Sequence, residues 1–236
     1  YPLALVAILV LFGLLVYSYF RASKMSSENK LWAGMAKETA HQIGTPLSSL
    51  MGWIEIMKLE EIDENIVDEV QKDVDRLQTI ADRFSKIGSE PNLELLNIVE
   101  ETKKSFDYLQ SRSSKQINFK FETNTDIVNL MLNPTLHSWT IENLVKNAID
   151  AIKGKGNVEV EIRNNENTLQ ILVSDTGKGI PKNQFRKVFE PGFSTKKRGW
   201  GLGLSLTQRI VEKYHKGSIR VLKSEIGKGT VFSIQY

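Results

Sequence analysis

The sequence has no cysteine among its 236 residues, and its three histidines are scattered along the chain. Disulfide scaffolds and thiolate metal sites are therefore excluded, and the histidines do not have the spacing of metal ligands. The absence of cysteine also fits a reducing compartment. The formal net charge is only +3 and no basic block stands out, so we expect no nucleic-acid partner.

Charge is also missing from residues 1–20, which are almost entirely apolar. At about 1.5 Å per residue, a helix of this length spans the ~30 Å hydrocarbon core of a bilayer. Arg21 and Lys24 follow at once, and positive charge on that flank favours a cytoplasmic location for what comes next. Neither the basic start nor the small-residue cleavage site of a signal peptide is visible. We expect a transmembrane helix over 1–20 and a juxtamembrane linker over 21–30. Because the chain opens with a tyrosine, we also expect it to be a fragment.

Residues 31–88 carry two runs of apolar side chains at the spacing of amphipathic helices. The polar residues 60–64 separate the runs, so we expect two long helices joined as an antiparallel hairpin. One hairpin cannot bury both stripes, whereas two hairpins can do so as a four-helix bundle, and we predict a homodimer. The stripe residues are Trp32, Met35, Ala36, Ala40, Ile43, Leu47, Leu50, Ile54 and Met57, then Ile66, Val70, Val74, Leu77, Ala81, Phe84 and Ile87.

His41 lies on the first of these helices but away from its apolar stripe. At about 100° per residue, its side chain falls on the opposite face, so we expect it to face water. Glu38 and Thr45 fall on the same side of the helix as His41. Pro46 cannot donate to the carbonyl of Gln42, so a bend is expected there.

Residues 88–92 interrupt the second helix and mark the expected boundary of a second domain, residues 89–236. There we expect an α+β fold with helices on one face of a mixed sheet. Asn133 is the expected N-cap of one helix, and 158–163 pairs with 168–174 as a hairpin. The expected helices are 95–109, 134–152 and 204–215, and the expected strands are 116–122, 127–132, 158–163, 168–174, 217–222 and 230–236.

Two stretches of this domain suit a phosphorylated, amine-bearing ligand. Asp175 ends a buried strand, and Gly177 and Gly179 follow it, so a carboxylate lies beside a turn that allows positive φ. Asn143 and Asn147 share one face of a helix, and carboxamide oxygens are hard ligands that suit Mg²⁺. Either pattern alone is also compatible with an ordinary turn or an ordinary polar helix face.

In chain order, 143–148, 175–181 and 199–204 resemble the N, G1 and G2 boxes of one ATP-binding fold. Histidine kinases, Hsp90-type chaperones and mismatch-repair ATPases share that fold. Residues 40–47, Ala-His-Gln-Ile-Gly-Thr-Pro-Leu, resemble the H box of bacterial sensor histidine kinases of two-component systems. The resemblance implies a HisKA-type dimerisation hairpin followed by a GHKL-type α/β-sandwich domain.

The family implies an ATP-dependent protein-histidine kinase that phosphorylates itself on His41. It would pass the phosphoryl group to an aspartate of a response regulator, from the cell inner membrane with its catalytic part in the cytoplasm. ATP and Mg²⁺ are the implied cofactors, with Asn147 as the metal ligand. Residues 189–196 resemble the F box and a short ATP lid. The implied nucleotide contacts are Asn143, Asn147, Asp175, Gly177, Gly179, Ile180, Phe189, Thr195, Lys196, Gly199, Gly201, Leu202, Gly203, Leu204 and Thr230.

Gln42 departs from the family, which commonly has Glu or Asp after the histidine. Glutamine can accept a hydrogen bond but cannot take a proton. Either Gln42 only orients the His41 ring, or Glu38 one turn earlier supplies the charge. Thr45 resembles the residue that positions water for dephosphorylating a partner, although local bonding to the backbone also explains it. An ATP-binding module acting mainly as a response-regulator phosphatase is therefore the alternative function.

Overall fold

The computed structural model describes residues 2–60, 62–87, 91–165, 168–196 and 201–236. The chain divides into two compact units, Tyr1–Glu90 and Pro91–Tyr236. Within the described ranges, side chains are not described at 2, 4, 21–33, 35–37, 39, 76, 80, 83–85 and 87, which include the predicted stripe residues Trp32, Met35, Ala36, Phe84 and Ile87.

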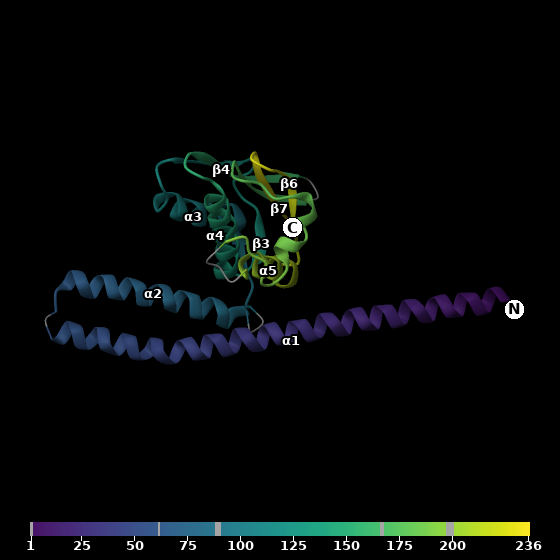
Figure 1. Ribbon diagram of the computed structural model, residues 1–236, viewed down its shortest axis with the longest axis horizontal. Coiled ribbons are helices and arrows are strands. Elements are labelled where there is room, and N and C mark those ends of the chain that lie inside the picture. The colour runs from purple at the N-terminus through teal and green to yellow at the C-terminus, as the bar shows by residue number, and fades with distance from the viewer. Residues whose placement is uncertain (1, 61, 88–90, 166–167, 197–200) are drawn as a thin grey trace. The chain divides into compact units, whose positions relative to one another are not determined.

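The first unit is a helical hairpin of α1 (Pro2–Leu59) and α2 (Glu64–Ile87) (Figure 1). The hairpin is as expected, but α1 is one continuous helix that includes residues 21–30, where a linker was expected. α1 continues through Pro46 to Leu59. The two helices pack through a small apolar core, to which each contributes every second turn. Its buried members are Leu47, Ile54, Val67 and Val74.

The hairpin leaves much of its apolar surface uncovered. Leu50, Trp53, Ile56, Ile66 and Leu77 are all exposed, with Trp53 at 58% and Ile66 at 55%. Leu50, Ile66 and Leu77 belong to the predicted stripes, so a single hairpin buries only part of them. Exposed apolar patches of this kind typically mark a surface that another chain covers.

α1 also contains the apolar run that ends at Phe20, and its large side chains are exposed where described, with Leu3 at 86% and Phe20 at 68%. Among the residues that the structure describes, no helix has the length and apolar character needed to cross a membrane. The transmembrane helix expected over residues 1–20 is therefore not confirmed.

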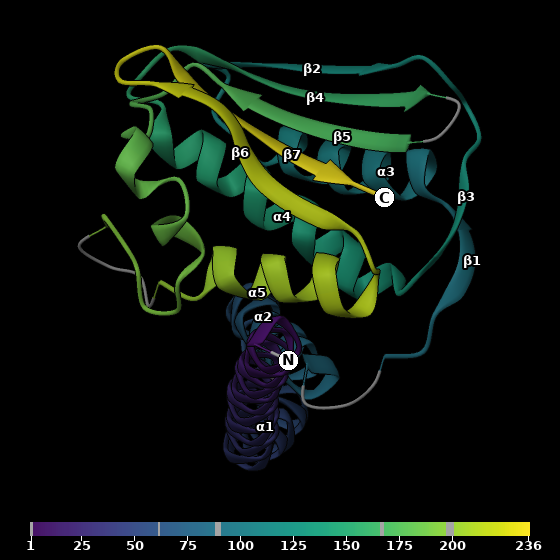
Figure 2. The same cartoon turned by 90° about the vertical axis from the view of Figure 1, so that its right-hand side faces the viewer.

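The second unit is built on a five-stranded mixed sheet with the strand order β2-β4-β5-β7-β6. β2 and β4 are parallel, and the other neighbours are antiparallel. α3 and α4 lie against one face, with α5 beside α4 on the same side (Figure 2). The α+β arrangement is as expected. The bounds are α3 (Ile98–Ser111), β2 (Ile117–Thr123), α4 (Pro134–Ala151), β4 (Gly156–Asn165), β5 (Thr168–Asp175), α5 (Gly203–Arg209), β6 (Ser218–Glu225) and β7 (Gly229–Gln235).

The core lies between this sheet and α4. Alternate residues of β4 and β5 point toward the helices, because successive side chains of a strand face opposite sides. They include Val160 and Ile171, which meet Ile141 and Leu144 of α4, all fully buried. Each such side chain contributes roughly 1.5–3 kcal/mol on burial. Asn133 caps α4 as predicted, its Oδ1 accepting from the Leu136 amide at 3.0 Å.

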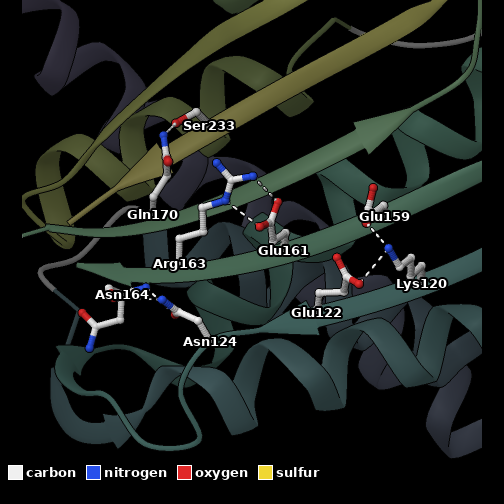
Figure 3. A network of polar contacts seen from close by, with 9 residues as sticks. All are labelled: Lys120, Glu122, Asn124, Glu159, Glu161, Arg163, Asn164, Gln170 and Ser233. Carbon is white, nitrogen blue, oxygen red and sulfur yellow. Dashed lines mark hydrogen bonds and ion pairs between the residues drawn. The ribbon is translucent and has the colours of Figure 1, made fainter.

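The other face of the sheet is polar. Lys120 of β2 pairs with Glu122 and with Glu159 of β4, and Arg163 pairs with Glu161 (Figure 3). These pairs are at the surface, where each contributes little to stability.

Two expectations for this unit are wrong. The helix expected from residue 95 begins at Ile98, because Glu94–Asn97 forms a short strand, β1, antiparallel to β3 (Asn129–Leu132). Asn97 then caps α3, its Oδ1 accepting from the Val99 amide at 3.2 Å. The helix expected over 204–215 is α5 followed by a π-helical turn, η3 (Ile210–Tyr214).

His137 and His215 are buried, at 0% and 7% exposure, where a position on a helix surface or at a helix end was expected, and His215 does cap the end of η3. His137 Nε2 lies 2.9 Å from Thr102 Oγ1, and His215 Nε2 accepts from the Asn133 amide at 3.1 Å. Their Nδ1 atoms have no hydrogen-bond partner among the described residues. Burial lowers the pKa of His137 to about 3, assisted by the charge of His215, and lowers the pKa of His215 to about 4.

Candidate functional site

Asp175 lies at the end of β5, and its side chain is 8% exposed. Its Oδ1 accepts from the Gly177 amide at 2.7 Å. Burial raises the pKa of the carboxyl, and hydrogen bonds from the Gly177 and Thr230 backbones oppose the rise. A carboxylate has about four acceptor positions, so Asp175 can still receive an exocyclic amine.

The turn after Asp175 is held by close packing between backbones. A Cβ on Gly177 would lie 2.6 Å from the Ala151 backbone at the end of α4. Gly179 has φ +74°, and a Cβ there would overlap the Glu225 carbonyl oxygen. The immediate requirement for these glycines is the close approach of α4 and of the β6–β7 turn. The packing fixes where Asp175 points.

Ser224 and Thr230 join this turn to the end of the sheet. The Ser224 hydroxyl accepts from the Ile180 amide at 2.7 Å and lies 2.9 Å from the Thr230 hydroxyl. Thr230 is opposite Asp175 in the β5–β7 ladder and is 3% exposed. Thr230 and Ile180 therefore lie beside Asp175, and Ser224, which the motifs did not suggest, connects them.

Asn143 on α4 packs against the start of α5. Its Nδ2 donates to Thr207 Oγ1 at 2.8 Å, and a Cβ on Gly203 would overlap its Oδ1. Gly203 is thus the residue that lets the start of α5 approach Asn143. α5 turns the positive end of its dipole toward this part of the unit.

Asn147 and Asp150 lie one turn apart on α4 and share a single cation. The Lys196 ammonium donates to Asn147 Oδ1 at 2.9 Å and pairs with Asp150 Oδ2 at 2.6 Å. Asn147 Oδ1 and Asp150 Oδ2 therefore form a cation-binding position on α4, the helix that also carries Asn143.

The segment before Lys196 is anchored at both ends of its described part. Phe189 is buried and meets Phe232 edge-on, with ring centroids 6.2 Å apart. The Thr195 hydroxyl accepts from Lys178 Nζ at 2.8 Å, which ties the segment to the turn after β5. The structure thus brings Thr195 and Lys196 to the edge of the same region.

The structure describes only part of the last glycine-rich stretch, residues 199–204. Gly199 lies outside the described residues, whereas Gly201 has φ +66° and a Cβ there would overlap the Gly192 carbonyl carbon. Leu202 and Leu204 are half-buried on either side of Gly203.

In the hairpin unit, His41 is exposed on α1. Gln42 Nε2 donates to Glu38 Oε1 at 2.7 Å, across one helical turn. The Thr45 hydroxyl donates to the His41 carbonyl at 3.4 Å, which is the local bonding expected before a proline. Gln42 and Thr45 therefore bond to groups of the preceding helical turn, while the His41 side chain is exposed to solvent.

The side-chain oxygens of Asn147 and Asp150 on α4 fit Mg²⁺ as ligands. Carboxamide and carboxylate oxygens suit a hard cation that also keeps water and phosphate ligands. Asn147 Oδ1 and Asp150 Oδ2 already hold an ammonium group. Among the described residues, no group of three or more His, Cys, Asp or Glu side chains could hold a metal ion. A metal here would depend on a bound polyphosphate for its remaining ligands.

Comparisons with known families identify both units. Residues 136–236 match the family model "Histidine kinase-, DNA gyrase B-, and HSP90-like ATPase", and residues 32–90 match the "His Kinase A (phospho-acceptor) domain".

Similar proteins cover most of this chain. Sporulation kinase A of Bacillus subtilis is 28% identical over 92% of the chain, and sensor histidine kinase ZraS of Salmonella typhimurium is 30% identical over 91%. The chain spans only 36% and 46% of those two proteins. Histidine kinase ThkA, solved in complex with response regulator protein TrrA, is 25% identical over 93% of this chain and 65% of its own, with a TM-score of 0.59.

Proposed function

Because this chain belongs to the sensor histidine kinase family, we propose that it transfers the γ-phosphoryl group of ATP to His41. The family models assign a phospho-acceptor domain to residues 32–90 and an ATPase-type domain to residues 136–236. The observation that carries the proposal is an exposed imidazole on α1 in a chain that also has a buried carboxylate beside a glycine turn.

His41 suits the role of nucleophile chemically. An imidazole nitrogen attacks the γ-phosphorus, the bond to the bridging oxygen breaks, and ADP leaves with the electron pair. The ring nitrogen that does not attack gives up its hydrogen as a proton, so a phosphoramidate forms. That bond is labile enough for the group to pass to a carboxylate.

In the ATP-binding unit, Asp175 would receive the adenine amine, with Ile180 and Thr230 beside it. Asn143, Gly201, Leu202, Gly203 and Leu204 would line the region of the phosphates, where the start of α5 favours negative charge. Gly199 belongs to the same motif in the sequence.

Asn147 would hold Mg²⁺, which neutralises phosphate charge when it is bound. Lys196 donates to Asn147 Oδ1 in this structure, and a metal ion bound at that oxygen would repel the ammonium group. We propose that the ammonium group then pairs with a phosphate oxygen, with Thr195 and Phe189 keeping the segment in reach. A cation therefore occupies the Asn147 oxygen in both states.

We also propose that two chains associate through their hairpins. Support comes from the exposed apolar residues of α1 and α2, among them Trp53 at 58%. Equilibrium sedimentation of Trp53→Glu should then show a larger fraction of monomer than the parent protein, and Ser48→Glu on the exposed surface serves as the control.

The partner that receives the phosphoryl group would be a response-regulator receiver domain. Support is indirect: ThkA, a similar histidine kinase, was solved with response regulator protein TrrA. A labelled chain should lose its phosphate to a cognate receiver, but not to a receiver whose acceptor aspartate is replaced by alanine.

Attachment to the inner membrane remains a proposal from the uncharged sequence of residues 1–20 and the exposed apolar side chains of α1 between Leu3 and Phe20. Carbonate extraction of cell membranes tests it. Recovery of the chain in the extracted supernatant would contradict the proposal.

The kinase activity is tested by incubating the chain with γ-labelled ATP and Mg²⁺. We expect a protein-bound label that acid removes and alkali preserves. His41→Gln should abolish the label, while Asn147→Asp or Asp175→Asn should reduce it by weakening nucleotide binding. Acid-labile label that persists in His41→Gln would rule out this acceptor.

A further inference from the structure

The H box of this chain lacks a carboxylate next to the reactive histidine, and the hydrogen bond at Gln42 shows where one is held instead. Gln42 Nε2 donates to Glu38 Oε1 at 2.7 Å. The direction of this bond is fixed by chemistry, because an ionised carboxylate only accepts hydrogen bonds. Gln42 therefore donates to Glu38 through one of the two hydrogens on its amide nitrogen.

Glu38 is placed to serve both of its neighbours. It lies four residues before Gln42 and three residues before His41, and both spacings put side chains on adjoining surfaces of a helix. The bond to Gln42 uses Oε1, so Oε2 of the same carboxylate remains for a second partner. Residues 41 and 42 are consecutive and point in directions about 100° apart, and the helical spacing of Glu38 places it next to both.

We propose that Glu38 is the proton acceptor for His41 and that Gln42 is the residue that positions it; this inference rests on the proposed kinase function. When one ring nitrogen bonds to phosphorus, the other carries the hydrogen and the ring becomes positively charged. Glu38 Oε2 receives that proton, which leaves a neutral phosphorylated ring and a protonated carboxyl. The ADP leaving group takes the electron pair of the broken P–O bond.

The residue exchange has a physical reason in this arrangement. A glutamate at position 42 would stand one turn from Glu38, and two like charges at this spacing repel each other. A glutamine at position 42 carries no charge, so the repulsion is absent, and it donates a hydrogen bond that positions the Glu38 carboxylate. In this arrangement the negative charge near His41 belongs to Glu38, one helical turn before position 42, where the family commonly has it.

The variant Glu38→Gln removes the negative charge of residue 38 but keeps its hydrogen bond to Gln42. The carbonyl oxygen of the new side chain can still accept from Gln42 Nε2, so the tie across the turn persists while the proton acceptor is lost. General-base catalysis contributes about 10²–10⁴-fold in enzymes, so the autophosphorylation kcat should fall at least tenfold with the KM for ATP unchanged. Glu38→Gln combined with Gln42→Glu returns a carboxylate to the region and should recover most of the rate.

The control is Glu55→Gln on the same helix, where Glu55 is exposed and pairs with Lys58 at 2.9 Å. Its rate should equal that of the parent chain. All variants are compared at equal helix content by circular dichroism and at saturating MgATP. Unchanged kcat in Glu38→Gln would overturn the inference, and so would a loss that Gln42→Glu does not recover.

Failure of the proposed kinase function gives a different result from failure of the role assigned to Glu38. If the parent chain binds MgATP but acquires no acid-labile label, the kinase function itself fails and the role of Glu38 fails with it. If the parent chain is labelled on His41 and Glu38→Gln is labelled at the same rate, only the role given to Glu38 is wrong.

Discussion

Acid should destabilise the second unit, Pro91–Tyr236, through two buried histidines far from His41 in the sequence. The pKa of His137 is about 3 and that of His215 about 4, against an ordinary value of 6.5. The unfolded chain therefore takes up protons below about pH 6.5, whereas the folded chain resists until pH 4 or below. Stability is complete above pH 6.5 and falls as the pH falls through this window.

The magnitude follows from these values. Between pH 7.5 and pH 5, each histidine loses about 2 kcal/mol of stabilisation, and the pair about 4 kcal/mol. That is a large share of the 5–15 kcal/mol that holds a typical domain folded. Asp175, whose pKa is raised by burial, has the opposite sign, because its charge costs stability only above the unfolded value of 3.8.

Urea denaturation of the chain at pH 7.5, 6 and 5 measures the effect. His137→Gln should lose about half of the pH-dependent drop, since one of the two protons no longer distinguishes the folded and unfolded states. His41→Gln, which changes an exposed residue, is the control and should keep the full drop. A free energy of unfolding that is the same at pH 7.5 and pH 5 would refute the reasoning.

Three further results are expected. Gly229→Ala should unfold the second unit or lower its melting temperature sharply, because a Cβ would overlap the Asp175 carbonyl, whereas Gly227→Ala, with φ +77° and open space, should cost only about 1–2 kcal/mol by calorimetry. Asp175→Asn should weaken nucleotide binding at least tenfold by fluorescence titration without lowering stability at pH 7, since burial penalises the charge; parallel losses of binding and stability would contradict this. Asp150→Asn should change the apparent ATP affinity less than about fivefold, because the exposed pair with Lys196 is worth about 0.2–1 kcal/mol; a hundredfold change would show that Asp150 contacts the metal directly.

Features set by local pattern could be predicted from the sequence. The hairpin of α1 and α2, the Asn133 cap and the β4–β5 hairpin each depend on residues close together in the chain. The side-by-side placement of Glu38 and Gln42 is also local, since helical spacing alone brings them together.

Features set by distant contacts could not be predicted. β1 forms because it pairs with β3 more than thirty residues away, and its apolar residues read equally well as the start of a helix. His137 and His215 are buried because α4 and the end of η3 meet in the fold. Likewise, a lysine 46 residues away gives Asp150 its partner.

The central claim is that this chain stores a phosphoryl group on one imidazole. Mass spectrometry of peptides prepared at alkaline pH after incubation with MgATP tests it most directly. The account predicts a single added phosphate on His41 and none on His137 or His215. An unmodified His41 in a chain that has consumed ATP, or phosphate on another residue, would contradict it.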